Sequence, residues 1–473
     1  MDFLGAAVSA VNDVLWSYVL IAMLVILGIY FSFRTKFVQI RMLREMFWAI
    51  TDGIGEKTKK NHVSSFQAFC ISTASRVGVG NIAGISIAIV TGGPGAIFWM
   101  WFIAVIGSAS GFVESTLAQI YKTRSPKGGF RGGPAYYIKN ALGSHAGGVF
   151  FAILISITYG LIFNSVQANT ITLATQAAFG IDRMTVGLIL AVLTGLVIFG
   201  GVTRIAKFTE WLVPIMASVY ILMSLYVTIV NITALPGMFM QILESAFNPD
   251  AAIGGGLGAA LMTGIKRGLF SNEAGMGSVP NAAATADVLH PVKQGLVQAM
   301  GVFVDTLLIC SSSAFIILLS GDYTQAVDSN GIQLTGVQLI QASLAQQFGA
   351  WAPGIVAIVI IMFAFSSIIG NYYYGENNIQ FFNGHTLYLQ VFRLLVVGMV
   401  VFGSVAKISL VWNLADFFMA LMAMTNLIAI TLLSKYAFCA LKDYCKQKRQ
   451  GIKDPVFHAS IIEDKKGIEV WED

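Results

Sequence analysis

Two glycine-rich stretches inside apolar runs hold the residue types best suited to bind a small ion or molecule. The first covers residues 75–84 and reads SRVGVGNIAG. An arginine at the centre of a membrane helix costs at least about 2.5–3.5 kcal/mol, and each glycine weakens a helix by up to about 1 kcal/mol relative to alanine. Close helix packing through small residues would explain the glycines, but it explains neither Arg76 nor Asn81. We therefore expect the helix to be interrupted here.

The second stretch covers residues 264–277 and reads GIKRGLFSNEAGMG. A helix that faces lipid could not hold Lys266, Arg267 and Glu273 together. Unwound backbone at membrane depth is tolerated only where it is buried in protein or lines a wet cavity. A surface loop is the alternative, although apolar runs flank the stretch on both sides.

An interrupted helix has a direct chemical use. It exposes unpaired N–H groups where one half-helix starts and unpaired carbonyls where the other ends. The N–H groups, at the positive end of the helix dipole, bind a carboxylate, and the carbonyls coordinate a cation. Two such breaks predict a site for a small anionic or zwitterionic molecule together with a cation.

The elements that carry these breaks are membrane helices. Apolar residues make up 56% of the 473 residues and charged residues 11%, against about 25% charged in a soluble domain. Runs long enough to span a bilayer, about 20 residues, predict an all-α membrane protein of about eleven transmembrane helices. They cover residues 14–33, 65–91, 95–120, 146–170, 183–201, 209–233, 254–282, 294–320, 351–374, 386–405 and 409–434.

The positions of the breaks predict the organisation of the chain. With the first span set aside, they fall in the first and sixth of ten spans, the pattern of a secondary transporter with a 5+5 inverted repeat. We expect an extra span and linker in residues 1–63 and a transporter core in 64–434. The core would comprise repeats over about 64–233 and 254–434, followed by a tail in 435–473.

Loop charge predicts the orientation. Basic residues gather in segments 34–63, 121–140 and the tail, while segments 231–252 and 321–350 hold acids and no Lys or Arg. Because basic loops stay in the cytoplasm, we expect a multi-pass protein of the inner (plasma) membrane with its amino terminus outside and its carboxyl terminus inside. Residues 37–50 fit a helix on the membrane surface and a cytoplasmic linker helix equally well.

Other classes of protein fit poorly. A net charge of +5 is too small to indicate nucleic-acid binding, and the four cysteines show no metal or disulfide spacing. No metalloprotease, nucleophile-elbow or paired-aspartate motif is present, so we expect neither an enzyme nor an organic cofactor. A channel would need a repeated filter or a continuous polar stripe, which two unequal breaks do not supply.

Five blocks in chain order resemble those of the alanine or glycine:cation symporter family. They are VGVGNIAG (77–84), GGPGAIFWMW (92–101), GGPAYYI (132–138), GLFSNEAG (268–275) and YYGE (373–376). The resemblance covers about residues 60–435. It implies a LeuT-type fold and import of a small neutral amino acid, alanine or glycine, by symport with sodium through alternating access. The implied partners are the amino acid, sodium and lipid, with a monomer as the functional unit.

The resemblance also implies where the substrate binds. The backbone at Gly78, Val79 and Gly80 should meet the carboxylate, and Asn81 should lie beside the amino acid, where its amide can both donate and accept. Further residues that match the family's pocket are Gly84, Ile87, Gln167, Phe270, Ser271 and Gly275. For Gln167 an interhelical hydrogen bond, and for Phe270 core packing, remain alternatives.

The implied sodium site is made of oxygen atoms. It would combine the carbonyls of Ala74, Val77 and Phe363 with the hydroxyls of Ser366 and Ser367. Serine back-bonding to its own helix is the alternative reading. No carboxylate falls at this site, which favours sodium over a proton, although proton coupling stays open.

Two departures from the family pattern affect the pocket. Ile87 stands where members often have threonine, and Asn371-Tyr372 follow Gly370 where some members have tryptophan. The second change would enlarge or polarise the pocket, so glutamine is an alternative substrate. The buried charges Arg76, Lys266, Arg267, Glu273 and Asp305 need partners, with a pairing of Arg76 to Glu273 or Asp305 as one hypothesis.

Overall fold

The computed structural model describes residues 11–51, 62–126, 128–199, 202–247, 256–328, 330–382 and 386–471. The basic segments 34–63 and 121–140, the acidic segment 231–252 and the run 254–282 extend beyond these ranges. Their residues outside the described part include Lys57, Lys59, Lys60, Lys127, Asp250, Gly254 and Gly255. Within the described part, helices form nearly all of the structure. Strands β1 (Thr123–Arg124) and β2 (Phe130–Arg131) pair antiparallel, with Thr123 opposite Arg131.

The first half of the chain contains the extra span and the first broken helix. Its elements are η1 (Leu15–Leu20), α2 (Ile21–Arg34), α3 (Val38–Arg41), α4 (Leu43–Thr51), α5 (Ser65–Arg76), η2 (Gly80–Gly84), α6 (Ile85–Gly92), α7 (Gly95–Ile120), α8 (Pro134–Asn140), α9 (His145–Ile157), η3 (Thr158–Phe163), α10 (Asn164–Phe179), α11 (Arg183–Ile198), α12 (Val202–Val230), η4 (Ile232–Ala234) and α13 (Leu235–Phe247).

The second half opens with the second broken helix. Its elements are α15 (Gly256–Asn272), α16 (Pro280–Ala283), α17 (Pro291–Phe303), η5 (Val304–Cys310), α18 (Ser311–Leu319), η6 (Tyr323–Gln325), α19 (Gly336–Phe348), α20 (Ala352–Phe382), α21 (Thr386–Val405), α22 (Ile408–Arg449) and η7 (Ala459–Ile461).

Each of the eleven predicted runs coincides with a helix or with a broken pair of helices. Among the described residues, eight helices are long and apolar enough to cross a membrane, and α5 with η2–α6 makes a ninth, bent by 50° at its break. The fold class is therefore confirmed, while the count of eleven stays a prediction. Helices also form inside segments expected to be polar connections, as α13 and α19 show.

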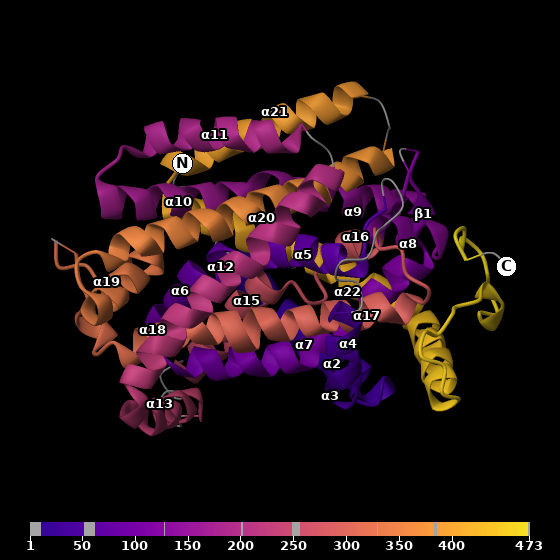
Figure 1. Cartoon of the computed structure of the whole chain (residues 1–473), viewed down its shortest axis with the longest axis horizontal. Coiled ribbons are helices and arrows are strands. Elements are labelled where there is room, and N and C mark those ends of the chain that lie inside the picture. The colour runs from indigo at the N-terminus through magenta and orange to yellow at the C-terminus, as the bar shows by residue number, and fades with distance from the viewer. Residues whose placement is uncertain are drawn as a thin grey trace.

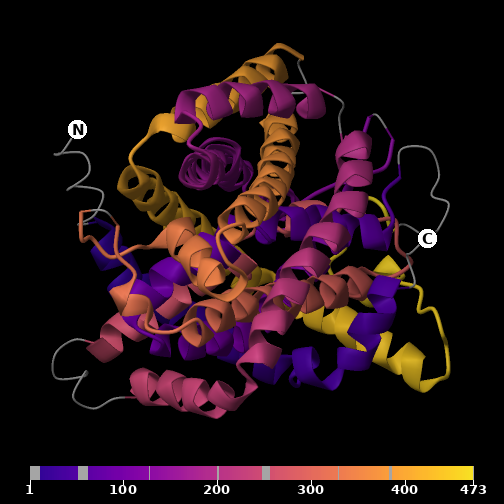
Figure 2. The same cartoon turned by 60° about the vertical axis from the view of Figure 1, so that its left-hand side comes forward.

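The helices form two packed groups that draw on both halves of the chain. In one, α7 packs against both α15 and α17; in the other, α10 packs on α20 and α21, and α11 packs on α21 (Figures 1 and 2). Helix starts are set locally. Ser64 and Gln67 form a reciprocal capping box before α5, and Asp182 caps α11 by accepting from two backbone amides. The breaks lie where the two groups meet.

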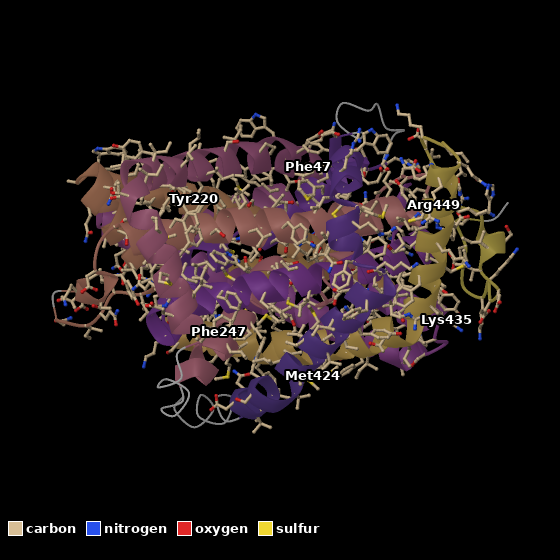
Figure 3. All side chains as sticks on the ribbon, turned by 90° about the horizontal axis from the view of Figure 1, so that it is seen from below. Phe47, Tyr220, Phe247, Met424, Lys435 and Arg449 are labelled. Atoms are coloured by element: carbon tan, nitrogen blue, oxygen red, sulfur yellow. The ribbon has the colours of Figure 1, made fainter. Side chains whose placement is uncertain are left out.

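The two ends of the bundle differ in charge as predicted. Helices α13, α18 and α19, next to the acidic connections, lie at the left of Figure 1, whereas α4, α8, β1 and the tail lie toward the right. Figure 3 shows Lys435 and Arg449 at the end away from Phe247. Basic segments thus share one end of the molecule, which is the arrangement that the loop-charge argument requires.

The tail packs on the bundle at its basic end. The Trp471 indole donates to the Gln119 carbonyl at 2.8 Å, and its ring lies 4.7 Å from the Lys122 ammonium and 5.3 Å from the Phe457 ring. The Phe457 amide in turn donates to the Leu289 carbonyl, just before α17. The tail therefore joins the end of α7 to the start of α17.

Close contact between α21 and α10 depends on a glycine. A Cβ added at Gly403 would lie 2.3 Å from the Ser165 carbonyl oxygen, so Gly403→Ala must push the two helices apart. We expect a loss of about 1–3 kcal/mol in stability, seen as a lower midpoint of thermal unfolding of the purified protein in detergent. Gly398→Ala on the same helix is the control, since no atom lies within 4 Å of its added Cβ. Equal midpoints for the two variants would contradict this account of the packing.

Candidate functional site

The first break exposes backbone carbonyls to α20. Helix α5 ends at Arg76, and Val77 leaves helical geometry with φ −80° and ψ 89°. The Ser367 hydroxyl on α20 lies 2.9 Å from the Ala74 carbonyl oxygen and 3.4 Å from that of Val77. A side chain at Gly78 would not fit here, because its Cβ would lie 2.2 Å from the Ser367 oxygen. The glycine thus permits the close approach of the two helices.

All five oxygens of the predicted sodium site lie together. Besides its contacts across to α5, the Ser367 hydroxyl is 3.1 Å from the Phe363 carbonyl oxygen. The Ser366 hydroxyl lies 2.7 Å from that carbonyl and 3.5 Å from the Ala74 carbonyl. Both serines are fully buried. Oxygen atoms from the end of α5 and from α20 therefore converge between the two helices.

This oxygen set suits a hard monovalent cation. The Ser367 hydroxyl has one proton and three carbonyl oxygens within 3.4 Å, so it can satisfy only one of them as a donor. A cation would satisfy the rest. Oxygen ligands without thiolate or imidazole select alkali and alkaline-earth ions over transition metals. The residues present thus fit sodium.

The amides that follow the carbonyls face polar side chains. The Gly78 amide donates to the Asn81 side-chain oxygen at 2.9 Å, and the Val79 amide donates to that of Gln167 at 3.1 Å. Gln167 lies on α10, so this bond joins the first broken helix to α10. These two side-chain oxygens occupy the positions that a carboxylate oxygen would take at the start of a half-helix.

Asn81 connects the first break to the second. Its side-chain nitrogen donates to the Asp305 carboxylate at 2.6 Å, and the Ser271 hydroxyl donates to the same carboxylate at 2.8 Å. All three residues are buried. Ser271 belongs to the last turn of α15, so Asp305, on η5, holds both broken helices at once.

An aromatic layer covers the break on its other side. The Phe270 ring lies between those of Phe163 and Trp412, with centroids 4.7 and 4.8 Å away. A Cβ at Gly80 would lie 2.8 Å from the Phe270 ring, and one at Gly84 would lie 3.6 Å from Trp412. The two glycines, both on η2, therefore leave room for this layer, whose rings lie on η3, α15 and α22.

Beyond the aromatic layer lies a buried ion cluster. One Arg267 nitrogen is 2.5 Å from both Asp416 carboxylate oxygens, and the Lys266 ammonium is 3.3 Å from one of them. The Arg267 guanidinium also lies 4.7 Å from the centroid of the Trp412 ring. The extra N-terminal helix joins in, since the Trp16 indole donates to the Asp416 carbonyl. Together these contacts tie α15 to α22.

The second break is held by a carboxylate from α7. Glu114 accepts from the amides of Gly275 and Gly277, each at 3.0 Å, and from the Asn426 side chain at 2.7 Å. Gly275 and Gly277 have φ of +83° and +85°, a backbone region open to glycine and strained for other residues. Tyr137 donates to the oxygen of the Asn426 amide. This network fixes the break from three helices.

The structure brings most of the predicted residues together, but not all. Gly275 commits its amide to Glu114, and Ile87 is half-buried one turn beyond Gly84. Their roles as substrate contacts stay predictions, like those of the other pocket residues. Trp412, Asp416 and Asn426 are not among the site residues predicted from the sequence. A lone aspartate in the apolar run 409–434 was the one signal that could have pointed to Asp416.

Arg76 does not form the ion pair that was one hypothesis. One of its terminal nitrogens donates to the Gln298 carbonyl at 3.2 Å, and within the described residues no carboxylate oxygen lies within 4 Å of it. Its remaining nitrogens have no hydrogen-bond partner there. Arg76 is 2% exposed, so it contributes a buried positive charge without a direct anionic partner.

Comparison with known proteins identifies the family. The model of the sodium:alanine symporter family matches residues 1–459. The chain belongs to the sodium:alanine symporter family. It is therefore a transporter and not an enzyme. The probable sodium/glutamine symporter GlnT of Bacillus subtilis (strain 168) is 56% identical over 464 residues, 98% of this chain and 95% of that protein.

Two further comparisons place the symporter among relatives. The sodium/alanine symporter AgcS of Methanococcus maripaludis is 36% identical over 96% of this chain and all of that protein. A crystal structure of a mutant manganese transporter of Eremococcus coleocola matches with a TM-score of 0.51 at 15% identity, covering 84% of this chain and 92% of that one. At this identity the likeness concerns the fold alone, which is of the LeuT type.

The network around Glu114 gives a test of the second break. In Glu114→Gln the amide has one acceptor oxygen in place of two, so one glycine N–H loses its partner and faces an NH₂ group. We expect the symporter to lose about 1–3 kcal/mol of stability, the cost of a buried unsatisfied donor. The measurement is the thermal unfolding midpoint in detergent. Glu244→Gln, at an exposed position on α13, is the control, and a midpoint as high as that of the control would show that Glu114 does not hold the break.

Proposed function

We propose that this symporter imports a small neutral amino acid, alanine or glycine, together with sodium. The observation that carries the proposal is the position of the oxygen cluster around Ser367 directly beside the amides of Gly78 and Val79. One half of the broken helix offers carbonyls to a cation, and the next residues offer amides to a carboxylate. Adjacent sites allow the two ligands to stabilise each other.

Binding of the amino acid would replace contacts that the protein makes to itself. The substrate carboxylate would take the place of the Asn81 and Gln167 oxygens at the two amides. The freed side chains of Asn81 and Gln167 can then bond to the amino acid. Phe270 and Ser271, on the second broken helix, would close the pocket around a short side chain. This exchange keeps every buried amide paired in both states, as membrane depth requires.

Transport would follow from breaking and remaking the contacts at the two ends of the pocket. The cluster of Arg267, Lys266 and Asp416 closes the end that loop charge assigns to the outside. Opening it would separate α15 from α22 and expose the aromatic layer. We place the symporter in the plasma membrane as a monomer, with its amino terminus outside and its basic end, including the tail, in the cytoplasm.

Glutamine is the second candidate substrate. A relative that shares 56% of its residues with this chain carries the name of a sodium/glutamine symporter. Asn371 supports this reading, because it is buried on α20 and its side-chain nitrogen has no hydrogen-bond partner among the described residues. An amide in the substrate could pair with such a group. Asn371 lies one turn beyond Ser367, close to the proposed cation.

Uptake by the purified protein tests the function. We expect proteoliposomes to accumulate labelled alanine when a sodium gradient points inward, with saturation, and not when potassium replaces sodium. Unlabelled glycine should compete in the same way as alanine. Strong competition by glutamine and weak competition by glycine would favour the second candidate. Uptake that is indifferent to the sodium gradient would contradict sodium symport.

Removal of one sodium ligand should weaken the ion more than the amino acid. Ser367→Ala deletes a hydroxyl that lies between three carbonyls. We expect the sodium concentration for half-maximal uptake to rise roughly tenfold, equivalent to about 1.4 kcal/mol, with a smaller change in the alanine half-saturation at high sodium. Ser156→Ala is the control, because this buried serine donates only to the Ala152 carbonyl of its own helix. An unchanged sodium half-saturation would refute the assignment of Ser367.

A further inference from the structure

One buried carboxylate at the second break has no part in the proposed sodium and substrate sites. Glu273 follows the last residue of α15, is 1% exposed, and has φ +57°. A non-glycine residue adopts this left-handed conformation at a cost, and it persists where surrounding contacts hold it. Those contacts are two hydroxyls: Ser75 lies 2.8 Å from one carboxylate oxygen and Ser278 lies 2.7 Å from the other.

With the Asn371 amide in the orientation that the structure gives it, the hydrogen bonds around Ser75 cannot all be satisfied with an ionised carboxylate. The Ser75 hydroxyl lies 2.8 Å from Glu273 and 2.7 Å from the side-chain oxygen of Asn371. It has one proton, so it can donate to only one of these two acceptors. The Asn371 nitrogen, meanwhile, has no partner among the described residues. The arrangement therefore has a mismatch of one proton.

Two arrangements remove the mismatch, and they differ by a proton on Glu273. If the carboxyl is protonated, it donates to Ser75, and Ser75 donates to the Asn371 oxygen. If it is ionised, Ser75 donates to it, and the Asn371 amide turns to donate its NH₂ group to Ser75. Amide oxygen and nitrogen have nearly the same shape, so both orientations fit the same space. The proton on Glu273 thus sets the direction of a hydrogen-bond chain from α15 through α5 to α20.

Two further polar groups lie in the same place. The hydroxyls of Tyr159, on η3, and Tyr374, on α20, are fully buried. Tyr159 faces Glu273 and Ser278, and Tyr374 faces Ser75. Their rings contact each other, with centroids 5.3 Å apart. These hydroxyls give the carboxyl group additional donors or acceptors in either protonation state.

The charges that face Glu273 come from several helices. Arg76, on α5, and Asp305, on η5, both act on it electrostatically. Arg76 also acts on Asp305 and on Glu114 of α7. Three buried carboxyl groups therefore share one guanidinium, which forms no ion pair within 4 Å in the described residues. A site with excess negative charge at membrane depth can take up a cation, and the smallest is a proton.

The chain through Ser75 ends at the elements that carry the sodium oxygens. Ser75 follows Ala74, whose carbonyl lies 2.9 Å from the Ser367 hydroxyl. Asn371 lies one turn beyond Ser367 on α20. Contact between the helices is tight here, since a Cβ at Gly370 would lie 2.8 Å from the Ser75 nitrogen. A change in the hydrogen bonds of Ser75 therefore takes place one residue away from Ala74, a proposed sodium ligand.

We propose that Glu273 is a proton-binding site whose occupancy opposes that of sodium. An ionised Glu273 adds a negative charge near the oxygen cluster and favours the cation, whereas a protonated Glu273 removes that charge and reverses the hydrogen-bond chain. Sodium binding then releases the proton, and proton binding weakens sodium. The inference rests on the proposed function, because it takes the Ser367 cluster as the sodium site.

Proton release on sodium binding gives a direct test. Purified protein in a weakly buffered solution with a pH indicator should release protons when sodium chloride is added, and fewer with an equal addition of potassium chloride. In Glu273→Gln the release should be lost, because the neutral amide mimics the protonated carboxyl. Glu244→Gln, at an exposed position on α13, is the matched control and should release protons like the unchanged protein. Equal release by Glu273→Gln and the control would overturn the assignment to Glu273.

The pH dependence of sodium affinity gives a second test. The sodium half-saturation of alanine uptake should rise as the pH falls, by at most about tenfold per pH unit for one competing proton. Glu273→Gln should show a high sodium half-saturation that varies less with pH. Ser75→Ala, which cuts the chain but keeps the carboxyl, should reduce the pH dependence.

The two tests separate this inference from the proposed function. Sodium-dependent uptake with a sodium half-saturation that does not change with pH, and without proton release, would overturn the role of Glu273 and leave sodium symport intact. Absence of sodium-dependent uptake would instead remove the proposed function, and the proton-release measurement would still decide whether sodium and a proton compete. If Glu273→Gln fails to fold, the unchanged protein still shows whether sodium displaces a proton, and an unaltered pH dependence in Ser75→Ala would overturn the assignment to Glu273.

Discussion

The structure depends on one constraint: backbone amides and carbonyls exposed by two broken helices must find partners where water is scarce. Each break meets it with side chains from helices distant in sequence. Asn81 and Gln167 accept from amides of the first break, and Glu114 accepts from two amides of the second. Those partners determine how the helix groups pack against each other. The proposed substrate site therefore uses contacts that also hold the fold together.

Polar groups near the two breaks differ in how completely their hydrogen bonds are satisfied. This difference distinguishes the structural network around Glu114 from the proposed binding site. The Glu114 network uses both carboxylate oxygens, two glycine amides and Asn426. Around Ser367 and Ser75, by contrast, one hydroxyl faces more acceptors than it can serve. At such positions a hydrogen bond within the protein can be replaced by a contact with a ligand. Flexibility of this kind is local and does not require the surrounding helices to be loose.

Much of the fold could be predicted from sequence because lipid imposes long apolar runs, and the glycine-rich stretches at 75–84 and 264–277 marked both breaks. Five oxygens were predicted by family resemblance as sodium ligands; the structure brings all five together, and their role stays a prediction. The pairing of Arg267 with Asp416 could not be predicted, because the two residues are 149 positions apart and nothing local links them. Helices α13 and α19 were missed for a different reason. They lie in segments too polar to span, where hydropathy does not distinguish a helix from a loop.

The position of Glu114 affects how the second break interacts with anions dissolved in the surrounding solution. The amides of Gly275 and Gly277, at the end of a broken helix, form a site that would attract a small anion such as chloride. Here a side chain fully buried in the protein fills that position. Because Glu114 is part of α7, it stays in place when the salt concentration around the cell changes. The second break therefore has its acceptor within the protein and does not need a dissolved anion from either side of the membrane.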